Sequence, residues 1–325
     1  MKHLLEKTIA GEPFKYDEAF SFIMAIEQET ISSEVIAGIL VGIQLRGITL
    51  EEIKGFRSAL IQLSRPIELE SQDAIDLCGT GGDGKNTFNI STTSSLVLAG
   101  MGYKVIKHGN YGVSSICGSS NVLEALGFEF TSDNIQLEKN LTKDNICFLH
   151  APLFHPTMKK IAPIRKSLGV KTLFNCLGPL VNPAQPKYQL TGTYSLELSK
   201  FYQHILKDIR HDYRVVYGMD GYDEITLTDA TRILGKHVDH TIDASNFNTQ
   251  PVPSKDLFAG NSVQDAASII RSILSGQGTE AHNKVISGNV AVAIQMFEPN
   301  NSLKDLYNET QHFLKSGHAA QILPH

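Results

Sequence analysis

The first 65 residues of the chain carry apolar side chains at the spacing of amphipathic helices. In the runs Phe20–Ile26 and Val35–Ile43, apolar positions recur every three or four residues, which is typical of helices with one buried face. The sequence TLEE at 49–52 is a capping box, which predicts the start of a third helix. The pattern ends at Pro66. We therefore predict a helical N-terminal domain over residues 1–66.

The rest of the chain alternates short apolar runs with helical stretches. The apolar runs predict strands at 74–78, 103–106, 146–149 and 213–217. Helical patterns accompany them at 96–99, 122–126, 264–275 and 281–296. Such alternation indicates an α/β domain with a mostly parallel central sheet. We place it at 67–325, with helical parts near 155–185 joining the N-terminal domain in space. The segment GPLVNPA at 178–184 is predicted to be a rigid turn and not a strand.

The composition adds limits on what the chain can be. Of 325 residues, 42% are hydrophobic and 19% charged, which is ordinary for a soluble globular protein. The formal net charge of −5 does not favour nucleic acid as a partner. We find no apolar stretch that suits a signal peptide or a membrane span. The four cysteines include no C-x-x-C pair, which predicts reduced thiols in a cytoplasmic protein and no zinc site.

The segment GTGGDGKNTFNIST, at 79–92, directly follows the first predicted strand. Its small residues leave backbone N–H groups open to wrap a phosphate, and hydroxyls follow them. It overlaps two nucleotide-binding patterns, and its context excludes both. The dinucleotide pattern needs an acid at the end of the next strand, where Lys107 stands, and the ATPase pattern needs a hydroxyl at Asn86. Asp83 would repel a phosphate unless it meets a metal or a sugar hydroxyl. A glycine-rich turn without a ligand is the alternative.

A second segment rich in glycine and serine, KHGNYGVSSICGSS at 107–120, follows the next predicted strand. A helix that opens near Ser119, with its N–H groups and the neighbouring hydroxyls, predicts a second anion site. Lys107 either belongs to this site or is an ordinary solvated charge. For His108, a polar core residue is the safer interpretation.

Two further elements suggest a metal and a carboxylate. Asp223 and Glu224 follow the strand predicted at 213–217, and adjacent carboxylates at a strand end suit Mg²⁺. An acidic surface turn is the commoner interpretation of such a pair. Arg165 lies on a helix opened by Pro156, and a guanidinium matches both oxygens of a planar carboxylate. Alone, it would most often be a helix-surface arginine.

Taken together, these elements resemble the anthranilate phosphoribosyltransferases of tryptophan biosynthesis over essentially the whole chain. The segments that carry the resemblance are 79–83, 89–92, 107–110, 118–119, 155–165, 178–180 and 223–224. The resemblance implies an α/β fold of the nucleoside phosphorylase and phosphoribosyltransferase type, in which a small N-terminal helical domain accompanies the large α/β domain. It also implies a homodimer formed through the helical N-terminal part.

The resemblance implies two substrates and a metal ion. Phosphoribosyl diphosphate would bind residues of the two glycine-rich segments: Gly79, Gly82, Asp83, Thr87, Asn89, Ile90, Ser91, Thr92, Lys107, His108, Gly109, Asn110, Ser114, Ser115 and Ser119. Anthranilate would bind Gly79, Asn110, His155 and Arg165, the last of them through its carboxylate. The ligands of Mg²⁺ would be Ser91, Asp223 and Glu224. No residue is expected to act as a covalent nucleophile.

The implied reaction moves 5-phosphoribose from phosphoribosyl diphosphate to the amine of anthranilate. Because this aromatic amine is neutral at pH 7, it needs no strong general base, and catalysis would rest on positioning and on stabilising the departing diphosphate. A pyrimidine nucleoside phosphorylase is one alternative, since it shares the general fold but needs neither Arg165 nor the Asp223–Glu224 pair. A nucleic-acid-binding relative of the same fold is the non-catalytic alternative.

The chain departs from the commoner family pattern in its second glycine-rich segment. Where many members carry an arginine and a lysine, this chain has Tyr111 and Ile116. We therefore expect fewer cations around the diphosphate than in those relatives. Tyr217 stands where a histidine is usual, and nothing in the sequence explains that difference.

Overall fold

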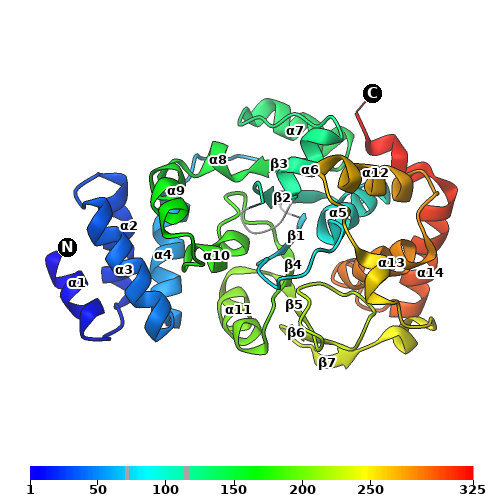
Figure 1. The fold of residues 1–325 in the computed structure, drawn as a ribbon. Helices are drawn as coiled ribbons and strands as arrows, with labels where there is room; N and C mark the ends of the chain where they lie inside the picture. The colour runs from blue at the N-terminus through cyan, green and yellow to red at the C-terminus, as the bar shows by residue number, and fades with distance from the viewer. Residues whose placement is uncertain (70–72, 113–116, 325) are drawn as a thin grey trace. The chain divides into compact units, whose positions relative to one another are not determined.

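The computed structural model describes residues 1–69, 73–112 and 117–324, and the chain forms two compact units. The smaller unit combines residues 1–67 with 151–185, and the larger unit combines 68–150 with 186–325. The stretch near 155–185 therefore belongs with the N-terminal helices. Figure 1 follows the chain through both units by colour.

The smaller unit is helical throughout its described regular elements (Figure 1). These are α1 (Lys2–Ile9), α2 (Tyr16–Glu27), α3 (Ser33–Arg46), α4 (Leu50–Gln62), α8 (Ala151–Phe154), α9 (Pro156–Leu168), α10 (Phe174–Leu177) and the 3₁₀ helix η1 (Gly178–Leu180). The three helices expected in the first 65 residues are confirmed as α2, α3 and α4. The sequence pattern misses α1, which buries only Leu4 and Thr8. The turn expected at 178–184 is confirmed, because η1 is its one regular element.

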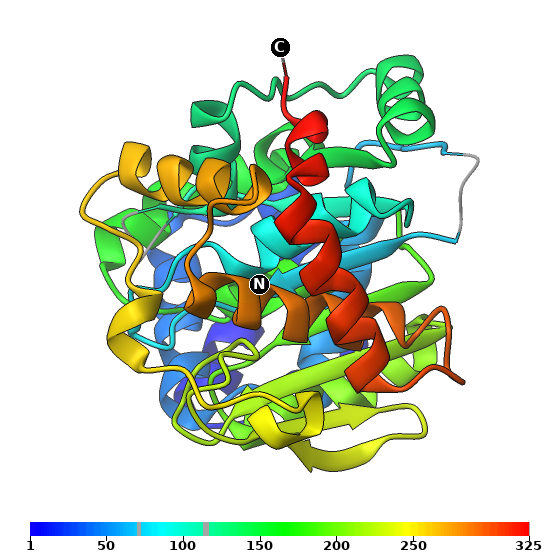
Figure 2. The same ribbon diagram turned by 90° about the vertical axis from the view of Figure 1, so that its right-hand side faces the viewer.

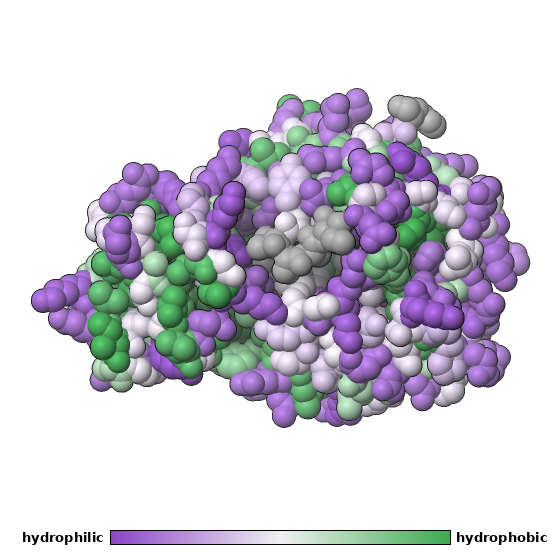
Figure 3. Space-filling view, viewed as in Figure 1, coloured by the Kyte–Doolittle hydropathy of each residue, from purple (hydrophilic) through white to green (hydrophobic). Residues whose placement is uncertain are grey.

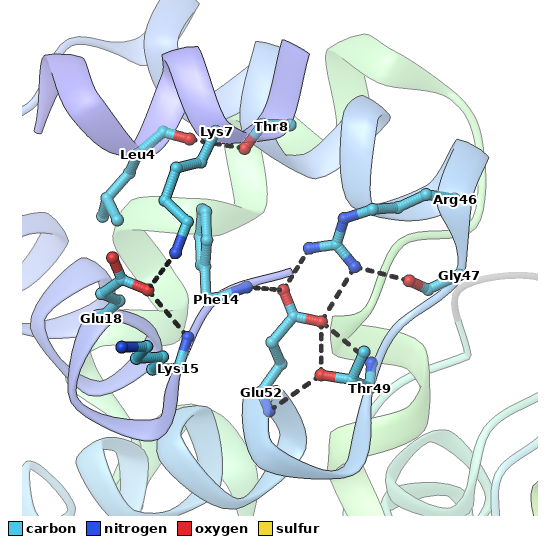
Figure 4. Close-up of polar contacts among 10 residues, drawn as sticks. All are labelled: Leu4, Lys7, Thr8, Phe14, Lys15, Glu18, Arg46, Gly47, Thr49 and Glu52. Atoms are coloured by element: carbon cyan, nitrogen blue, oxygen red, sulfur yellow. Dashed lines mark hydrogen bonds and ion pairs between the residues drawn. The ribbon is translucent and has the colours of Figure 1, made fainter. Parts of the chain in front are cut away.

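A buried carboxylate joins three segments of the smaller unit (Figure 4). Glu52 is fully buried and accepts hydrogen bonds from the guanidinium of Arg46. It also accepts the N–H of Phe14 at 3.0 Å and the N–H of Thr49 at 2.9 Å. The Thr49 hydroxyl accepts the N–H of Glu52 in return, so the expected capping box is present. Burial acts to raise the pKa of Glu52, but the bonds from Arg46 and the two N–H groups outweigh it and lower that pKa.

We expect Glu52→Gln to lower the free energy of unfolding by about 3 kcal/mol at pH 7, because Arg46 then loses its partner charge. Since folding lowers the pKa of Glu52, its stabilisation is complete above the unfolded value, near 4.5, and is lost as the pH falls through the folded value. Urea unfolding at pH 7 and in acid measures both effects. The exposed neighbour Glu51→Gln is the control. A stability difference between wild type and Glu52→Gln that stays constant into acid would contradict this account.

The larger unit is built on a seven-stranded sheet with the order β3-β2-β1-β4-β5-β6-β7 (Figure 1). The strands are β1 (Ile75–Gly79), β2 (Val105–Gly109), β3 (Ile146–His150), β4 (Tyr188–Gly192), β5 (Asp212–Gly218), β6 (Thr231–Gly235) and β7 (Asp239–Ile242). β1 to β5 are parallel, and β6 and β7 are antiparallel. The mostly parallel sheet is confirmed, and the four expected strands are β1, β2, β3 and β5. The sequence pattern misses β4, β6 and β7.

Helices cover this sheet, and the four helical patterns of the sequence fall on α5, α6, α12 and α13. The helices are α5 (Ile90–Gly100), α6 (Ser119–Ala125), α7 (Asn134–Lys143), α11 (Leu196–Ile209), α12 (Val263–Leu274), α13 (Glu280–Ile294) and α14 (Leu303–Ser316), with 3₁₀ helices η2 (Ala244–Phe247), η3 (Ser254–Leu257) and η4 (His318–Ile322). α13 packs against both α5 and α14 (Figure 2). Ile75, Leu77 and Val290 thereby share one apolar core. In the described part of the chain, the helices are all too short or too polar to cross a membrane.

Candidate functional site

Five parallel strands end along one edge of the sheet in the larger unit. Four of them end on glycine, and β3 ends on a histidine: Gly79, Gly109, His150, Gly192 and Gly218. Open α/β sheets bind ligands outside this edge. Two of these glycines pack closely against Asp223. A Cβ at Gly192 would lie 1.5 Å from the carbonyl oxygen of Asp223, and one at Gly79 would lie 2.7 Å from its Oδ2. The turn that carries Asp223 is therefore packed against bare backbone.

The first glycine-rich segment is fastened to that turn. The N–H of Gly81 donates to Oδ2 of Asp223 at 2.8 Å. The ammonium of Lys85 lies 4.7 Å from the ring centre of Tyr222. The N–H of Lys85 also donates to the carboxylate of Asp83 at 3.0 Å. These contacts give the loop one shape and place the acidic turn beneath it.

The same segment is paired with a stretch of chain that precedes α12. The N–H of Phe88 donates to the carbonyl of Leu257 at 2.8 Å. The N–H of Ala259 donates to the carbonyl of Asn86 at 3.0 Å. Thr87, between the two bonds, lies in a short antiparallel bridge. The partners stand far apart in the sequence, so no local pattern predicts this pairing.

The first turn of α5 lies beside the acidic turn. The N–H of Ser91 donates to Oε1 of Glu224 at 3.2 Å. The flanking side chains, of Ile90 and Thr92, are each 1% exposed, so only their backbone can face a ligand. The side-chain amide of Asn89 donates at 3.1 Å to a carbonyl of the second glycine-rich segment. α5 thus connects both glycine-rich segments with the acidic pair.

The second glycine-rich segment closes on itself. The carbonyl of Asn110 accepts the hydroxyl of Ser119 at 3.4 Å. The amide oxygen of Asn121 accepts the N–H groups of Gly112 and Gly118, both at 3.0 Å. A Cβ at Gly118 would lie 2.1 Å from the nitrogen of Gly112, so this closure requires glycine. The two described ends of the segment are held together in this way.

Lys107 and His108 lie near the end of β2 with different surroundings. Lys107 is 2% exposed, and its ammonium donates to the carbonyl of Leu77. His108 is 7% exposed, and its N–H donates to the buried carboxylate of Asp76 at 3.3 Å. The interpretation of His108 as a polar core residue agrees with this burial. Three residues of the expected donor loop lie outside the described residues: Ser114, Ser115 and Ile116.

Asp223 and Glu224 bring two adjacent carboxyl groups to this edge. Asp223 is 8% exposed, and Glu224 is partly buried. Burial and the charge of Asp83 raise the pKa of Asp223. Burial and the charge of Asp223 raise the pKa of Glu224. Each carboxylate is thus destabilised in its charged form, and a cation between them and a phosphate would relieve that cost.

Two residues expected to bind anthranilate lie in the smaller unit. His155 is 2% exposed, and its Nε2 lies 2.8 Å from the carbonyl oxygen of Val181. Burial lowers the pKa of His155 to about 4, so its ring is neutral at pH 7. The guanidinium of Arg165 lies 5.8 Å from the ring centre of Phe174 and donates to Oδ1 of Asn175 at 3.3 Å. The other two expected anthranilate residues, Gly79 and Asn110, lie in the larger unit.

Comparison with known proteins shows to which family the chain belongs. The model of the family described as "Glycosyl transferase family, a/b domain" matches residues 71–320, and that described as "Glycosyl transferase family, helical bundle domain" matches residues 2–64. The anthranilate phosphoribosyltransferase of Christiangramia forsetii is 47% identical over 98% of this chain and 96% of its own. That of Bacteroides fragilis strain YCH46 is 40% identical over 99% and 98%. The chain belongs to the anthranilate phosphoribosyltransferase family.

Solved structures of anthranilate phosphoribosyltransferases share the fold. The enzyme of Thermus thermophilus aligns with a TM-score of 0.90 at 31% identity, over 98% of this chain and 96% of that one. The Saccharomyces cerevisiae enzyme in complex with PRPP and Mg aligns with a TM-score of 0.86 over 94% and 90%; at 24% identity, this is a likeness of fold. The resemblance seen in the motifs and the expected fold class are both confirmed.

The acidic turn of this family member fits a magnesium ion that keeps part of its water shell. Among residues 1–69, 73–112 and 117–324, no three His, Cys, Asp or Glu side chains form a ready-made metal cage. Mg²⁺ is usually held by one or two carboxylates together with substrate phosphates and water. Asp223, which accepts the N–H of Gly81, and Glu224, which accepts the N–H of Ser91, match that pattern.

Sequence reasoning misses three structural features that lie beside the expected site residues. Gly192 ends β4, a strand that the apolar pattern does not reveal. The stretch that pairs with Asn86 and Phe88 stands far along the chain. His150 follows an apolar run and looks like an ordinary strand end. For Gly192 a signal exists: glycine also ends the neighbouring strands β1 and β5.

Proposed function

We propose that this protein transfers 5-phosphoribose from phosphoribosyl diphosphate to the amine of anthranilate, in tryptophan biosynthesis. The products are N-(5-phosphoribosyl)anthranilate and diphosphate. The observation that carries the proposal is the attachment of the first glycine-rich segment to the acidic turn, through the bonds of Gly81 to Asp223 and of Ser91 to Glu224. Asn89 of the same segment bonds to the second glycine-rich segment. Relatives at 47% and 40% identity bear the name of this activity.

In this proposal the donor lies along the carboxyl edge of the sheet. Its diphosphate faces the N–H groups of the first glycine-rich loop, and Lys107 supplies a positive charge. Ile90 and Thr92 act through their backbone, because their side chains are buried. The described residues proposed to bind the donor are Gly79, Gly82, Asp83, Thr87, Asn89, Ile90, Ser91, Thr92, Lys107, His108, Gly109, Asn110 and Ser119.

The residues of the chain position the reactants and stabilise charge. The neutral amine attacks C1 of the ribose; the C1–N bond forms as the C1–O bond to diphosphate breaks, and the amine loses a proton to solvent. Lys107 and the loop N–H groups stabilise the departing diphosphate. Bound Mg²⁺ would neutralise part of that charge, held by Ser91, Asp223 and Glu224. The cysteines are unsuited to nucleophilic attack, since burial raises the pKa of each thiol.

The test is an assay of anthranilate fluorescence with the full chain. We expect the fluorescence to fall only when phosphoribosyl diphosphate and Mg²⁺ are both present, and chelation of the metal to stop the reaction. Phosphorolysis of thymidine or uridine without loss of anthranilate would support the nucleoside phosphorylase instead. A gel shift with nucleic acid at moderate salt, in a protein that consumes no anthranilate, would support the non-catalytic alternative.

Arg165 is the proposed partner of the anthranilate carboxylate, and His155 holds the backbone near Val181. We expect Arg165→Gln to raise the KM for anthranilate about 10- to 100-fold, because a lost charge-assisted bond costs about 1.5–3 kcal/mol. The KM for the donor should stay within about twofold. Steady-state kinetics with the exposed neighbour Lys166→Gln as control measure this. An equal rise in both KM values would contradict the assignment of Arg165 to the acceptor.

We propose that the protein is a homodimer and cytoplasmic. Figure 3 shows apolar side chains gathered over the helices of the smaller unit. α1 exposes Ile9 at 78%, and α3 exposes Val41 at 38% and Leu45 at 84%. Apolar surface of this kind on packed neighbouring helices is typical of an interface. Analytical ultracentrifugation measures the oligomeric state. The four cysteines form no disulfide with one another, which suits the cytoplasm.

A further inference from the structure

One of the five parallel strands ends on a large side chain at the carboxyl edge of the sheet, along which the donor is proposed to lie. The other four parallel strands end on glycine, and β3 ends on His150. His150 pairs with Gly109 across the sheet and is 6% exposed. Its imidazole is therefore buried next to the second glycine-rich segment. The reaction proposed above gives this ring no task.

Three side chains hold the imidazole in place. Nδ1 of His150 lies 2.8 Å from the hydroxyl oxygen of Ser120, in a buried hydrogen bond. Phe130 stacks on the ring with 4.7 Å between centroids and 10° between planes. Tyr111 meets the ring edge-on, with 4.7 Å between centroids. The Tyr111 hydroxyl donates in turn to Glu124 at 2.8 Å. Rings on two sides and a bond at Nδ1 fix the orientation of the imidazole.

His150 also lies close to residues that are proposed to bind phosphoribosyl diphosphate. A cavity of about 10 Å³ lies between Lys107, Ser119, Ser120 and His150, which is about the space for one water-sized oxygen. The N–H of Ser120 donates to the carbonyl of Asn110 at 3.1 Å. Ser120 therefore connects His150 with Ser119 and Asn110, both of which are proposed to bind the donor.

We propose that His150 is a positioning residue for donor binding. It fixes the Ser120 hydroxyl to β3, and this holds Ser119 and Asn110 in their binding geometry before the donor arrives. A preformed segment loses less conformational freedom on binding, so its affinity is higher. The inference rests on the proposed function. The competing explanation is that the ring only fills space between Phe130 and Tyr111.

Two substitutions separate the bond from the packing. His150→Phe keeps a ring of similar size and removes Nδ1, whereas His150→Asn keeps a polar atom near the position of Nδ1. We expect His150→Phe to raise the donor KM, and the Kd for phosphoribosyl diphosphate by calorimetry, about 5- to 10-fold. kcat should stay within about twofold. His150→Asn should recover most of the donor affinity. Ser120→Ala should match His150→Phe, and the double variant should lose no more than either one.

The control is Phe128→Leu. Phe128 packs against Phe148 with 4.9 Å between centroids, in the segment that also carries Phe130. We expect this variant to melt at a lower temperature with the donor KM of wild type. Equal donor KM values for wild type and His150→Phe would overturn the inference and leave the proposed function standing. A donor KM that follows the melting temperature across all variants would also overturn it. A wild type that consumes no anthranilate overturns the proposed function, and calorimetry with the donor then decides on His150.

Discussion

Exchanging Asp223 for Asn and Glu224 for Gln together is expected to lower kcat about 100- to 1,000-fold. The two amides still offer an oxygen to the N–H groups of Gly81 and Ser91, so the first glycine-rich segment keeps its attachment. What the exchange removes is negative charge. Kinetics over a titration of Mg²⁺ measure the effect, and the remaining activity should respond only weakly to the ion.

The same double exchange is expected not to lower the melting temperature in the absence of metal. Burial raises the pKa of both carboxyls, and a neighbouring negative charge adds to this: Asp83 acts on Asp223, and Asp223 acts on Glu224. The charged pair therefore already costs stability. The control is Asp229→Asn, an exposed acid in the same loop whose backbone bond an amide can replace. Wild-type kinetics in the double variant would refute the assignment of Asp223 and Glu224 to the metal. A large loss of stability together with activity would mean that the pair acts in folding instead.

Gly192→Ala is expected to abolish most of the activity through a change of one methyl group. The new Cβ would lie 1.5 Å from the carbonyl oxygen of Asp223, so the backbone of the acidic turn must move. The carbonyl of Gly192 also accepts the N–H of Thr80 at 2.9 Å, which fixes the start of the glycine-rich loop. One displacement therefore reaches both the proposed metal ligands and the loop proposed to bind the donor. We expect a loss of kcat of at least about 100-fold, measured by anthranilate fluorescence.

Two comparison variants keep this experiment informative if Gly192→Ala folds poorly. In Gly79→Ala the new Cβ would meet only the side chain of Asp223, at 2.7 Å, so the fold should survive while activity falls. In Gly288→Ala, inside α13, the nearest atom lies at an ordinary 3.6 Å, and neither stability nor activity should fall. Full activity in Gly192→Ala would show that the acidic turn can shift without consequence, which the packing described here forbids.

The strands that the sequence predicts are those with continuous apolar runs. The apolar pattern does not predict β4, because two of its buried residues are polar: Gln189 and Thr191 are both fully buried. The Gln189 amide donates to the Thr191 hydroxyl at 2.7 Å, and Arg210 donates to Gln189 at 2.8 Å. Satisfied hydrogen bonds replace apolar contact there, and hydropathy does not reveal them. The apolar pattern does not predict β7 either, because its residues Asp239, His240 and Thr241 are polar and exposed.

Some residues of the candidate site can be predicted from the sequence, and others cannot. Residues that act within one contiguous loop, such as Gly81, Ser91 and Ser119, can be found from the motif that contains them. Gly192 and His150 act through neighbours that only the sheet order supplies: Gly192 touches the turn after β5, and His150 lies beside the loop after β2. Their roles depend on register between strands, and register is a property of pairing that no single segment encodes.

The smaller unit is assembled from two stretches of chain with three strands of the sheet between them. Its halves are joined by side chains: Arg57 donates to the carbonyl of Leu180 at 2.9 Å, and Thr157 donates to Glu27 at 2.7 Å. On the ribosome, α1 to α4 therefore emerge well before α9 and η1 exist to complete them. At usual translation speeds this delay lasts roughly ten seconds. During that interval the nascent chain exposes the apolar faces of α2 to α4 together with an unfinished sheet, and protection by a chaperone would matter most then.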